Sequence, residues 1–242
     1  RKQISVVVGH DCRNNSRLFA ETVADIFSAN GIQVYLFESL RPTPEISFAI
    51  RQLKAQAGVN VTASHNPREY NGYKAYWEDG AQLPPDHAAV VSAAVADTDI
   101  FEGVKRMPFD EAVSQGIIEI IGKELDEAYL EAVLACRVCP DATENYGDSL
   151  NIIYTPLHGA GYRLVPEVLK RAGINNLRVV PSQAEPDGRF PTVKSPNPES
   201  KECFADGIDM ALSAGGACDL ILATDPDSDR VGIVVKDASG LF

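Results

Sequence analysis

The stretch Ile4-Ser5-Val6-Val7-Val8-Gly9 is a nearly continuous run of β-branched residues. A strand buried on both faces of a parallel sheet has this composition. The polar loop 10–16 follows, and Ser16 is expected to cap the next helix, which ends at Gly31. A second apolar run, 32–37, predicts another strand. The order strand, helix, strand indicates parallel neighbours joined by a right-handed connection.

The same order continues and then recurs in the second half of the chain. A helix beginning at Thr43-Pro44 and ending at Gly58 leads into a third strand, which runs into Ser64. In the second half, strands are predicted at residues 150–154, 177–180 and 219–224. The last of these runs into Asp225, so each half ends its third strand in a polar loop.

This repeat predicts an α/β fold with two consecutive, similar domains, residues 1–143 and 144–242. Each domain is expected to contain a mainly parallel, mixed sheet flanked by helices. In such sheets, ligands bind beyond the carboxyl ends of the strands. Both polar loops lie at such ends, and we therefore expect a functional site there.

The charge and the cysteine content exclude some classes of protein. A formal net charge of −12 argues against binding to nucleic acid or to an anionic membrane surface, although local cations can still bind an anionic substrate. Five irregularly spaced cysteines provide no disulfide framework, which favours a reducing compartment, here the cytoplasm. We interpret the C-x-x-C pair at 136–139 as two free thiols near a helix end, with zinc or redox chemistry as the lesser alternative.

The loop Asp225-Pro-Asp-Ser-Asp-Arg230 contains three alternating aspartates. In an extended loop their carboxylates can point to one place, and such oxygen ligands suit Mg²⁺. An EF-hand calcium loop has the same opening spacing but requires Gly at its sixth position and Glu at its twelfth. Arg230 and Lys236 occupy those positions, which excludes that type of site. Two alternatives remain. The loop is either a magnesium site in which Arg230 holds a phosphate or a solvated acidic turn.

The other polar loop is Thr62-Ala-Ser-His-Asn-Pro67, which follows a short apolar run. Pro67 keeps Asn66 out of the α region, so the loop stays open and the hydroxyl of Ser64 can face a cleft. A serine before a turn also forms local hydrogen bonds with no catalytic meaning. The aspartate loop, residues 225–230, follows the third strand of the second half just as this loop follows the third strand of the first half. This matching position favours the catalytic interpretation of Ser64.

Together these motifs resemble those of the α-D-phosphohexomutases, the family of phosphoglucomutase and phosphomannomutase enzymes. The resemblance is carried by the loop 62–67, by Tyr70-Asn-Gly-Tyr-Lys74 and by the loop 225–230. Further matches, in the same order along the chain, lie at residues 9–16, 155–159, 186–191 and 195–199.

The resemblance implies that Ser64 carries a phosphoryl group and transfers it to a sugar monophosphate. A sugar 1,6-bisphosphate would form as the intermediate and act as the activator. By the same match, Mg²⁺ is bound by a phosphate oxygen on Ser64 and by three aspartates, namely Asp225, Asp227 and Asp229.

The family also suggests roles for the neighbouring cations. Arg13, Lys74 and Arg230 would neutralise charge on the transferred phosphoryl group. His65 would move a proton, the alternative being a loop histidine that only orients Ser64. His158 is expected to have a structural role.

The resemblance further suggests that the chain is a fragment. It begins at Arg1 without Met and stops after a turn-like stretch at 237–240, so we expect both ends to be cut. It would cover most of the first and most of the second of four family domains, and its partners would be the missing C-terminal domains of the same polypeptide. We therefore expect the fragment to lack full turnover. The sugar is expected to be glucose, with phosphopentomutase and phosphomannomutase as alternatives.

Other functions are also compatible with single motifs. A nucleotidyl- or glycosyl-transferase could use Asp225 and Asp227 as a D-x-D metal site, but this leaves Ser64 and His65 unexplained. A serine hydrolase is disfavoured because no G-x-S-x-G turn surrounds Ser64. A non-catalytic module that binds sugar phosphate or metal would keep the aspartates without phosphoserine. An interaction scaffold would not need the aspartate loop.

Overall fold

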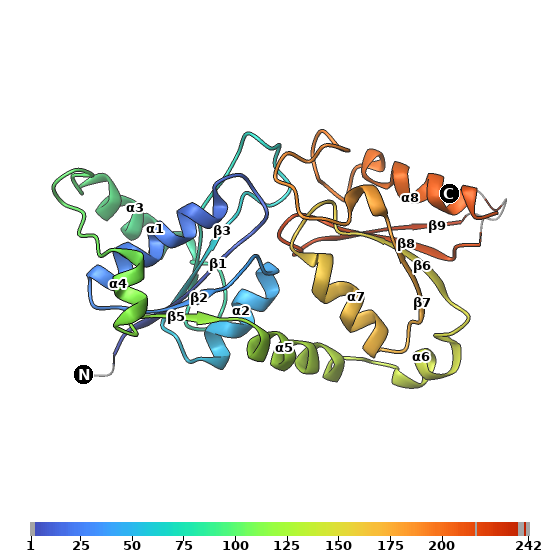
Figure 1. Cartoon of the computed structure of the whole chain (residues 1–242), viewed down its shortest axis with the longest axis horizontal. Helices are drawn as coiled ribbons and strands as arrows, with labels where there is room; N and C mark the ends of the chain where they lie inside the picture. The colour runs from blue at the N-terminus through green and yellow to red at the C-terminus, as the bar shows by residue number, and fades with distance from the viewer. Residues whose placement is uncertain (1–2, 216, 237–239, 241–242) are drawn as a thin grey trace. The chain divides into compact units, whose positions relative to one another are not determined.

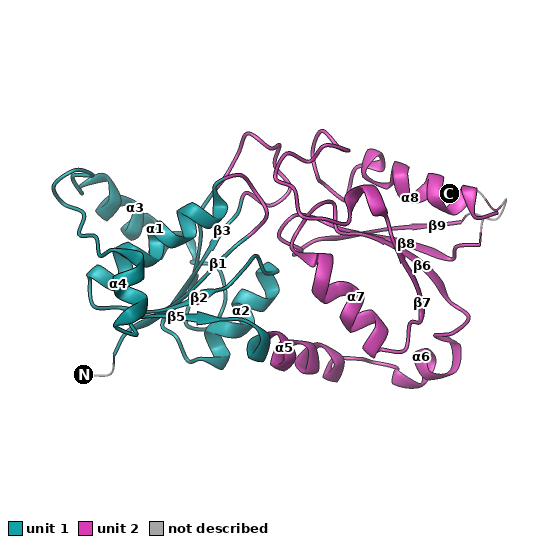
Figure 2. Cartoon of the chain, in the orientation of Figure 1, with its two compact units in different colours: residues 1–10, 15–62, 72–125 teal, residues 11–14, 63–71, 126–242 magenta. Residues whose placement is uncertain are grey.

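The computed structural model describes residues 3–215, 217–236 and 240, and the expected turn at 237–240 lies almost wholly outside them. The chain forms two compact units (Figure 2). The first unit comprises residues 1–10, 15–62 and 72–125, and the second comprises residues 11–14, 63–71 and 126–242. Two loops that leave strands of the first unit therefore belong, by their contacts, to the second.

The described part of the first unit contains a five-stranded sheet with the order β4-β3-β1-β2-β5 (Figure 1). All neighbouring strands are parallel except β3 and β4, which are antiparallel. The strands are β1 (Ser5–His10), β2 (Gln33–Phe37), β3 (Ala57–Val61), β4 (Lys74–Trp77) and β5 (Ile118–Ile121). The helices are α1 (Ser16–Ala29), α2 (Thr43–Gln52), α3 (Pro85–Ala96) and α4 (Phe109–Ser114), and α5 (Lys123–Ala135) continues into the second unit.

The described part of the second unit contains a four-stranded sheet with the order β7-β6-β8-β9. Its strands are β6 (Asn151–Thr155), β7 (Asn176–Val179), β8 (Leu220–Thr224) and β9 (Val231–Val235). Its helices are α6 (Pro140–Tyr146), α7 (Gly161–Arg171) and α8 (Ala205–Ser213), with short 3-10 turns η1 (Pro181–Gln183) and η2 (Lys201–Phe204). Figure 1 shows α7 and α8 on opposite faces of this sheet.

The two sheets repeat one plan, as the sequence predicts. In each, the first strand pairs in parallel with the second and the third, and the third pairs antiparallel with a fourth at the edge. Strands β1, β2, β3 and β4 thus correspond to β6, β7, β8 and β9. The predicted α/β class with two mainly parallel mixed sheets is confirmed.

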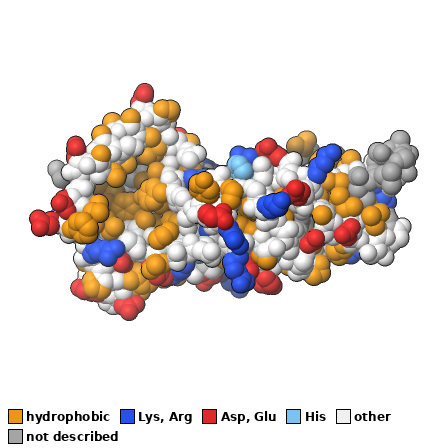
Figure 3. Space-filling view, turned by 90° about the horizontal axis from the view of Figure 1, so that it is seen from above, with side chains coloured by type: hydrophobic (Ala, Val, Ile, Leu, Met, Phe, Trp, Pro, Cys, Tyr) orange, Lys and Arg blue, Asp and Glu red, His pale blue; other side chains and the backbone are white. Residues whose placement is uncertain are grey.

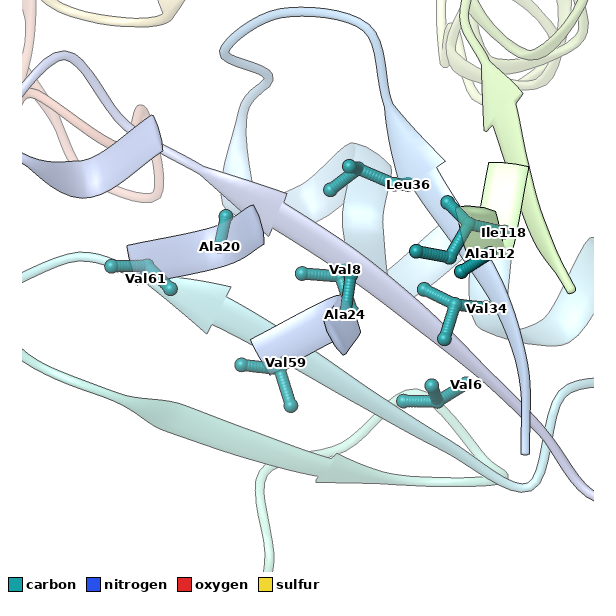
Figure 4. Close-up of a cluster of buried hydrophobic side chains, with 10 residues drawn as sticks. All are labelled: Val6, Val8, Ala20, Ala24, Val34, Leu36, Val59, Val61, Ala112 and Ile118. Carbon is teal, nitrogen blue, oxygen red and sulfur yellow. The ribbon is translucent and has the colours of Figure 1, made fainter. Parts of the chain in front are cut away.

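The valine run of β1 explains why the first sheet is covered on both faces. Val6 and Val8 belong to the cluster that α1 and α4 cover, shown in Figure 4 with Ala20, Ala24 and neighbouring strand residues. Val7 points to the other face, where it joins the cluster that α2 covers. Because successive side chains of a strand alternate between faces, a run of three valines supplies both cores.

Gly58 corrects one sequence prediction. It does not end the helix that begins at Thr43, because α2 ends at Gln52 and Gly58 is the second residue of β3. A Cβ atom built at Gly58 would overlap the side chain of Ile50, and one built at Gly9 would overlap that of Ile46. The missing side chains therefore let α2 pack closely on strands β1 and β3.

A second correction concerns the start of α1. Ser16 is the first helical residue and is fully buried, and the position before it is Asn15. Asn15 has a φ of 64° and makes no side-chain cap hydrogen bond. Asparagine tolerates this left-handed conformation better than most residues, which explains its place at the bend.

Three further features concern the length of the helices, the cysteines and the hydrophobic surface. Among the described residues, no helix has the length and apolar character required to cross a membrane. Cys136 and Cys139 are exposed free thiols directly after α5, as expected. Helix α3 has no buried residue, and Figure 3 shows hydrophobic side chains gathered on one face of the first unit.

Replacing Gly58 with Ala tests the close packing of α2. The added methyl group must displace Ile50, and we expect the free energy of unfolding to fall by about 1–3 kcal/mol in urea denaturation. Shortening the partner in the double variant G58A/I50V should restore part of this loss. An unchanged stability of the single variant, or no recovery in the double variant, would contradict the packing argument.

Candidate active site

The aspartate loop, residues 225–230, directly follows β8, and two of its three aspartates are buried. Asp225 and Asp227 are fully buried, whereas Asp229 is exposed. One oxygen of Asp225 accepts the backbone N–H groups of Asp229 (3.1 Å) and Arg230 (3.0 Å). These two hydrogen bonds hold the loop in a tight turn around the first carboxylate.

The three carboxylates repel one another. One ligand oxygen from each of Asp225, Asp227 and Asp229 lies within 4.8 Å of the others. Burial, and then the charges of the two neighbours, raise the pKa of Asp225 well above its ordinary value. A divalent cation would offset this repulsion, and a set of carboxylate oxygens is what Mg²⁺ prefers. The donor set therefore fits a magnesium ion.

The loop after β6, residues 156–161, is called the glycine-containing loop, and it supports the aspartate loop. The N–H of Ala160 donates to the carbonyl of Pro226 at 2.7 Å. A Cβ atom at Gly159 would meet the backbone of Pro226, and one at Gly161 would meet the hydroxyl of Ser228. At Gly159 the two loops pack backbone against backbone, and at Gly161 the absence of a side chain leaves room for the hydroxyl of Ser228.

The loop that contains Ser64, residues 63–71, is called the serine loop below. It belongs to the second unit by its contacts. Ser64 has a φ of 52°, and its hydroxyl donates to the second carboxylate oxygen of Asp225 at 3.0 Å. The same hydroxyl lies 3.3 Å from Nδ1 of His65. The structure thus brings together Ser64, His65 and the aspartate loop, which are far apart in the sequence.

Arg13 is buried beneath the serine loop. It is 3 % exposed, its Nε lies 3.3 Å from Asp11, and its guanidinium stacks over the ring of Phe190. The two terminal nitrogens donate to four backbone carbonyls of the serine loop, those of Ser64, Asn66, Pro67 and Tyr70. This geometry favours a role in positioning the loop over the expected neutralisation of charge on the transferred phosphoryl group.

The loop 185–200, called the proline-rich loop below, completes the support. A Cβ atom at Gly188 would meet the backbone of residues 12–14, so the two segments lie in close contact. The hydroxyl of Ser195 donates to the carbonyl of His65 at 2.8 Å. The sequence reasoning assigned no role to Gly188 or Ser195, although both lie within motifs that it quoted.

His158 joins the glycine-containing loop to the proline-rich loop. Its ring nitrogens lie 3.2 Å from the carbonyl of Glu185 and 3.0 Å from the hydroxyl of Thr192. Its own N–H donates to the carbonyl of Gln183. These contacts agree with the expected structural role.

The remaining cations of the prediction have different surroundings. Arg230 is half-exposed and donates to the carboxylate of Glu199 at 2.9 Å. Burial and the charge of Arg230 lower the pKa of His65 from its ordinary value. Lys74 is the first residue of β4 in the first unit, in register with Asn60. The structure therefore groups all the predicted site residues except Lys74 within the second unit.

Comparison with known proteins identifies related families and sequences. Residues 1–100 match the model of phosphoglucomutase/phosphomannomutase α/β/α domain I, and residues 127–240 match that of domain II. A phosphoglucomutase of Staphylococcus epidermidis is 39% identical over 236 residues, which cover 97% of this chain and 42% of the relative. A phosphoglucomutase of Staphylococcus aureus is 34% identical over 98% of this chain and 41% of its own. The chain thus spans less than half the length of these relatives.

Solved structures show the same architecture. A provisionally named phosphomannomutase from Thermus thermophilus superposes with a TM-score of 0.77 at 29% identity, over 100% of this chain and 50% of the other. A phosphoglucomutase/phosphomannomutase family protein from Burkholderia thailandensis gives a TM-score of 0.71 at 23% identity, over 96% of this chain and 46% of the other, and supports the fold alone.

Magnesium should stabilise the protein through the aspartate loop. Once Mg²⁺ reaches roughly 100 times its dissociation constant, we expect the free energy of unfolding in urea to rise by about 2.7 kcal/mol over chelated protein. The variant D227N, which removes one buried charge at nearly constant volume, should lose most of this rise. An equal rise in wild type and D227N, or none in wild type, would disprove a magnesium site at this loop.

Arg13 should be required for the order of the serine loop. Lysine at this position keeps the charge but cannot supply the planar set of donors, and each buried carbonyl left without a donor costs roughly 1–3 kcal/mol. We expect R13K to accelerate amide hydrogen exchange across residues 63–71 at least about tenfold. The matched control is R68K, because Arg68 lies in the same loop but is exposed. Equal exchange in the two variants would refute the role of Arg13.

Proposed function

Because the chain belongs to the phosphoglucomutase/phosphomannomutase family, we propose that it carries the phosphoserine of an enzyme that interconverts hexose 1-phosphate and hexose 6-phosphate. The observation that carries this proposal is the 3.0 Å separation between the hydroxyl of Ser64 and the carboxylate of Asp225, at a loop whose three carboxylates suit Mg²⁺. A serine hydroxyl beside a magnesium loop suits phosphoryl transfer, which depends on positioning and charge neutralisation.

The reaction proceeds in two transfers. In the first, the bond between phosphorus and Oγ of phosphoserine 64 breaks, while a bond forms to a hydroxyl oxygen of the sugar monophosphate. The resulting sugar 1,6-bisphosphate turns in the site, and its other phosphoryl group returns to Oγ in the second transfer. Atoms balance, because each sugar hydroxyl that receives a phosphoryl group releases one proton and each that loses one regains it.

The neighbouring residues have distinct roles in this proposal. Asp225, Asp227 and Asp229 would hold Mg²⁺, which would supply positive charge to the oxygens of the transferred group. His65 accepts and returns the proton. Its lowered pKa keeps the ring neutral at pH 7, and its Nδ1 lies 3.3 Å from Oγ of Ser64. Arg230 binds a phosphate oxygen, and Lys74 contributes positive charge, as the family motif suggests.

The relatives named phosphoglucomutase support glucose as the sugar. Phosphomannomutase and phosphopentomutase activities are the alternatives within the same family. We propose that full turnover requires parts of the enzyme beyond these 242 residues, since the chain corresponds to 42% of the Staphylococcus epidermidis relative. We also propose that the first domain ends at residue 143 and that the second begins at residue 144.

Phosphorylation of Ser64 is the direct test of the proposed function. The purified chain is incubated with Mg²⁺ and glucose 1,6-bisphosphate, and its intact mass and phosphopeptides are determined. We expect one phosphoryl group on Ser64 and none in S64A. Failure to load Ser64 in this chain would show that loading needs the rest of the enzyme. The same failure in the full-length enzyme would exclude the mutase mechanism and leave a non-catalytic binding module.

A further inference from the structure

The segment Ser195-Pro-Asn-Pro-Glu199 contacts both loops of the candidate site. At one end, the hydroxyl of Ser195 donates to the carbonyl of His65 in the serine loop (2.8 Å). At the other end, the carboxylate of Glu199 accepts a hydrogen bond from Arg230, the last residue of the aspartate loop (2.9 Å). The function proposed above gives this segment no role.

The backbone of the segment is well fixed. Pro196 and Pro198 are buried, and their rings restrict the backbone to one φ region. The side-chain oxygen of Asn197 accepts the N–H of Glu199, and its backbone N–H donates to the carbonyl of Ser195. Glu199 therefore approaches Arg230 from a rigid support that is itself attached to the serine loop.

The ion pair at the end of this support is nevertheless weak and accessible. The side chain of Glu199 is 74% exposed and that of Arg230 is 40% exposed. Exposed ion pairs contribute little to stability because water screens them. A phosphate offers the planar guanidinium two parallel, charge-assisted hydrogen bonds and is the stronger partner. The pair is thus suited to exchange one anion for another.

We propose that Glu199 is an exchangeable counter-ion that positions Arg230 until a phosphate group takes its place. This inference rests on the proposed function, in which Arg230 binds a phosphate. When the bisphosphorylated sugar turns between the two transfers, its phosphate must leave Arg230, and Glu199 then re-forms the ion pair. The carboxylate thereby keeps Arg230 oriented and weakens its hold on phosphate enough for the intermediate to reorient. Glu199 is a positioning residue and takes part in no bond-making step.

The test compares E199Q with E202Q in the 242-residue chain. Glu202 is a matched control, because it carries the same charge three residues away and makes no ion pair among the described residues. Inorganic phosphate is the probe, titrated in the presence of Mg²⁺ while the Nε–Hε signal of Arg230 is followed by NMR. We expect E199Q to bind phosphate about two- to fivefold more tightly than wild type, and E202Q to bind as wild type does.

Dependence on Arg230 separates this role from a general effect of charge. In the background R230Q, or R230K if the glutamine variant does not fold, the E199Q substitution should no longer change phosphate affinity. Equal affinities of E199Q and E202Q would overturn the proposal, as would weaker binding by E199Q or no phosphate binding by wild type. The titration needs no phosphoryl transfer. A positive titration, combined with no phosphate on Ser64 in the full-length enzyme, would therefore count against the mutase function alone.

Discussion

The geometry of the candidate site depends on how the backbone carbonyls of the irregular serine loop find hydrogen-bond donors. Residues 63–71 form no helix or strand, and buried carbonyls without donors would make that conformation costly. Arg13 solves this problem by donating to four of those carbonyls from a buried position. The direction of the Ser64 hydroxyl toward Asp225 follows from this arrangement, and so does the place of His65.

Glycines explain how the surrounding elements come close enough. In the first unit, Gly9 and Gly58 admit α2 onto the sheet. In the second, Gly159 and Gly161 admit the aspartate loop, and Gly188 admits the segment that carries Arg13. Side chains at these positions would hold the segments apart. The absence of a side chain thus allows close core packing in the first unit and the close approach of the site loops in the second.

The sequence predicted most of the fold because the relevant signals are local. The valine run of β1, the repeated order of strands and helices, and the polar loops after Val61 and Thr224 can each be recognised within a few residues. The Gly58 prediction was wrong because a glycine near a helix end has the same local appearance as one beneath a packed helix. The contacts of Arg13, Ser195 and Glu199 join residues up to 130 positions apart, and no local pattern encodes such partners.

The hydrogen bond between Ser64 and Asp225 joins residues 161 positions apart. Closing so long a loop is entropically costly and slow, so contacts of this kind form late in folding. A ribosome that has released only the first sheet has therefore produced Ser64 and Arg13 without Asp225. The candidate site can appear only after residues 225–230 have been synthesised, so the chemistry of Ser64 depends on a segment that is made about 161 residues later.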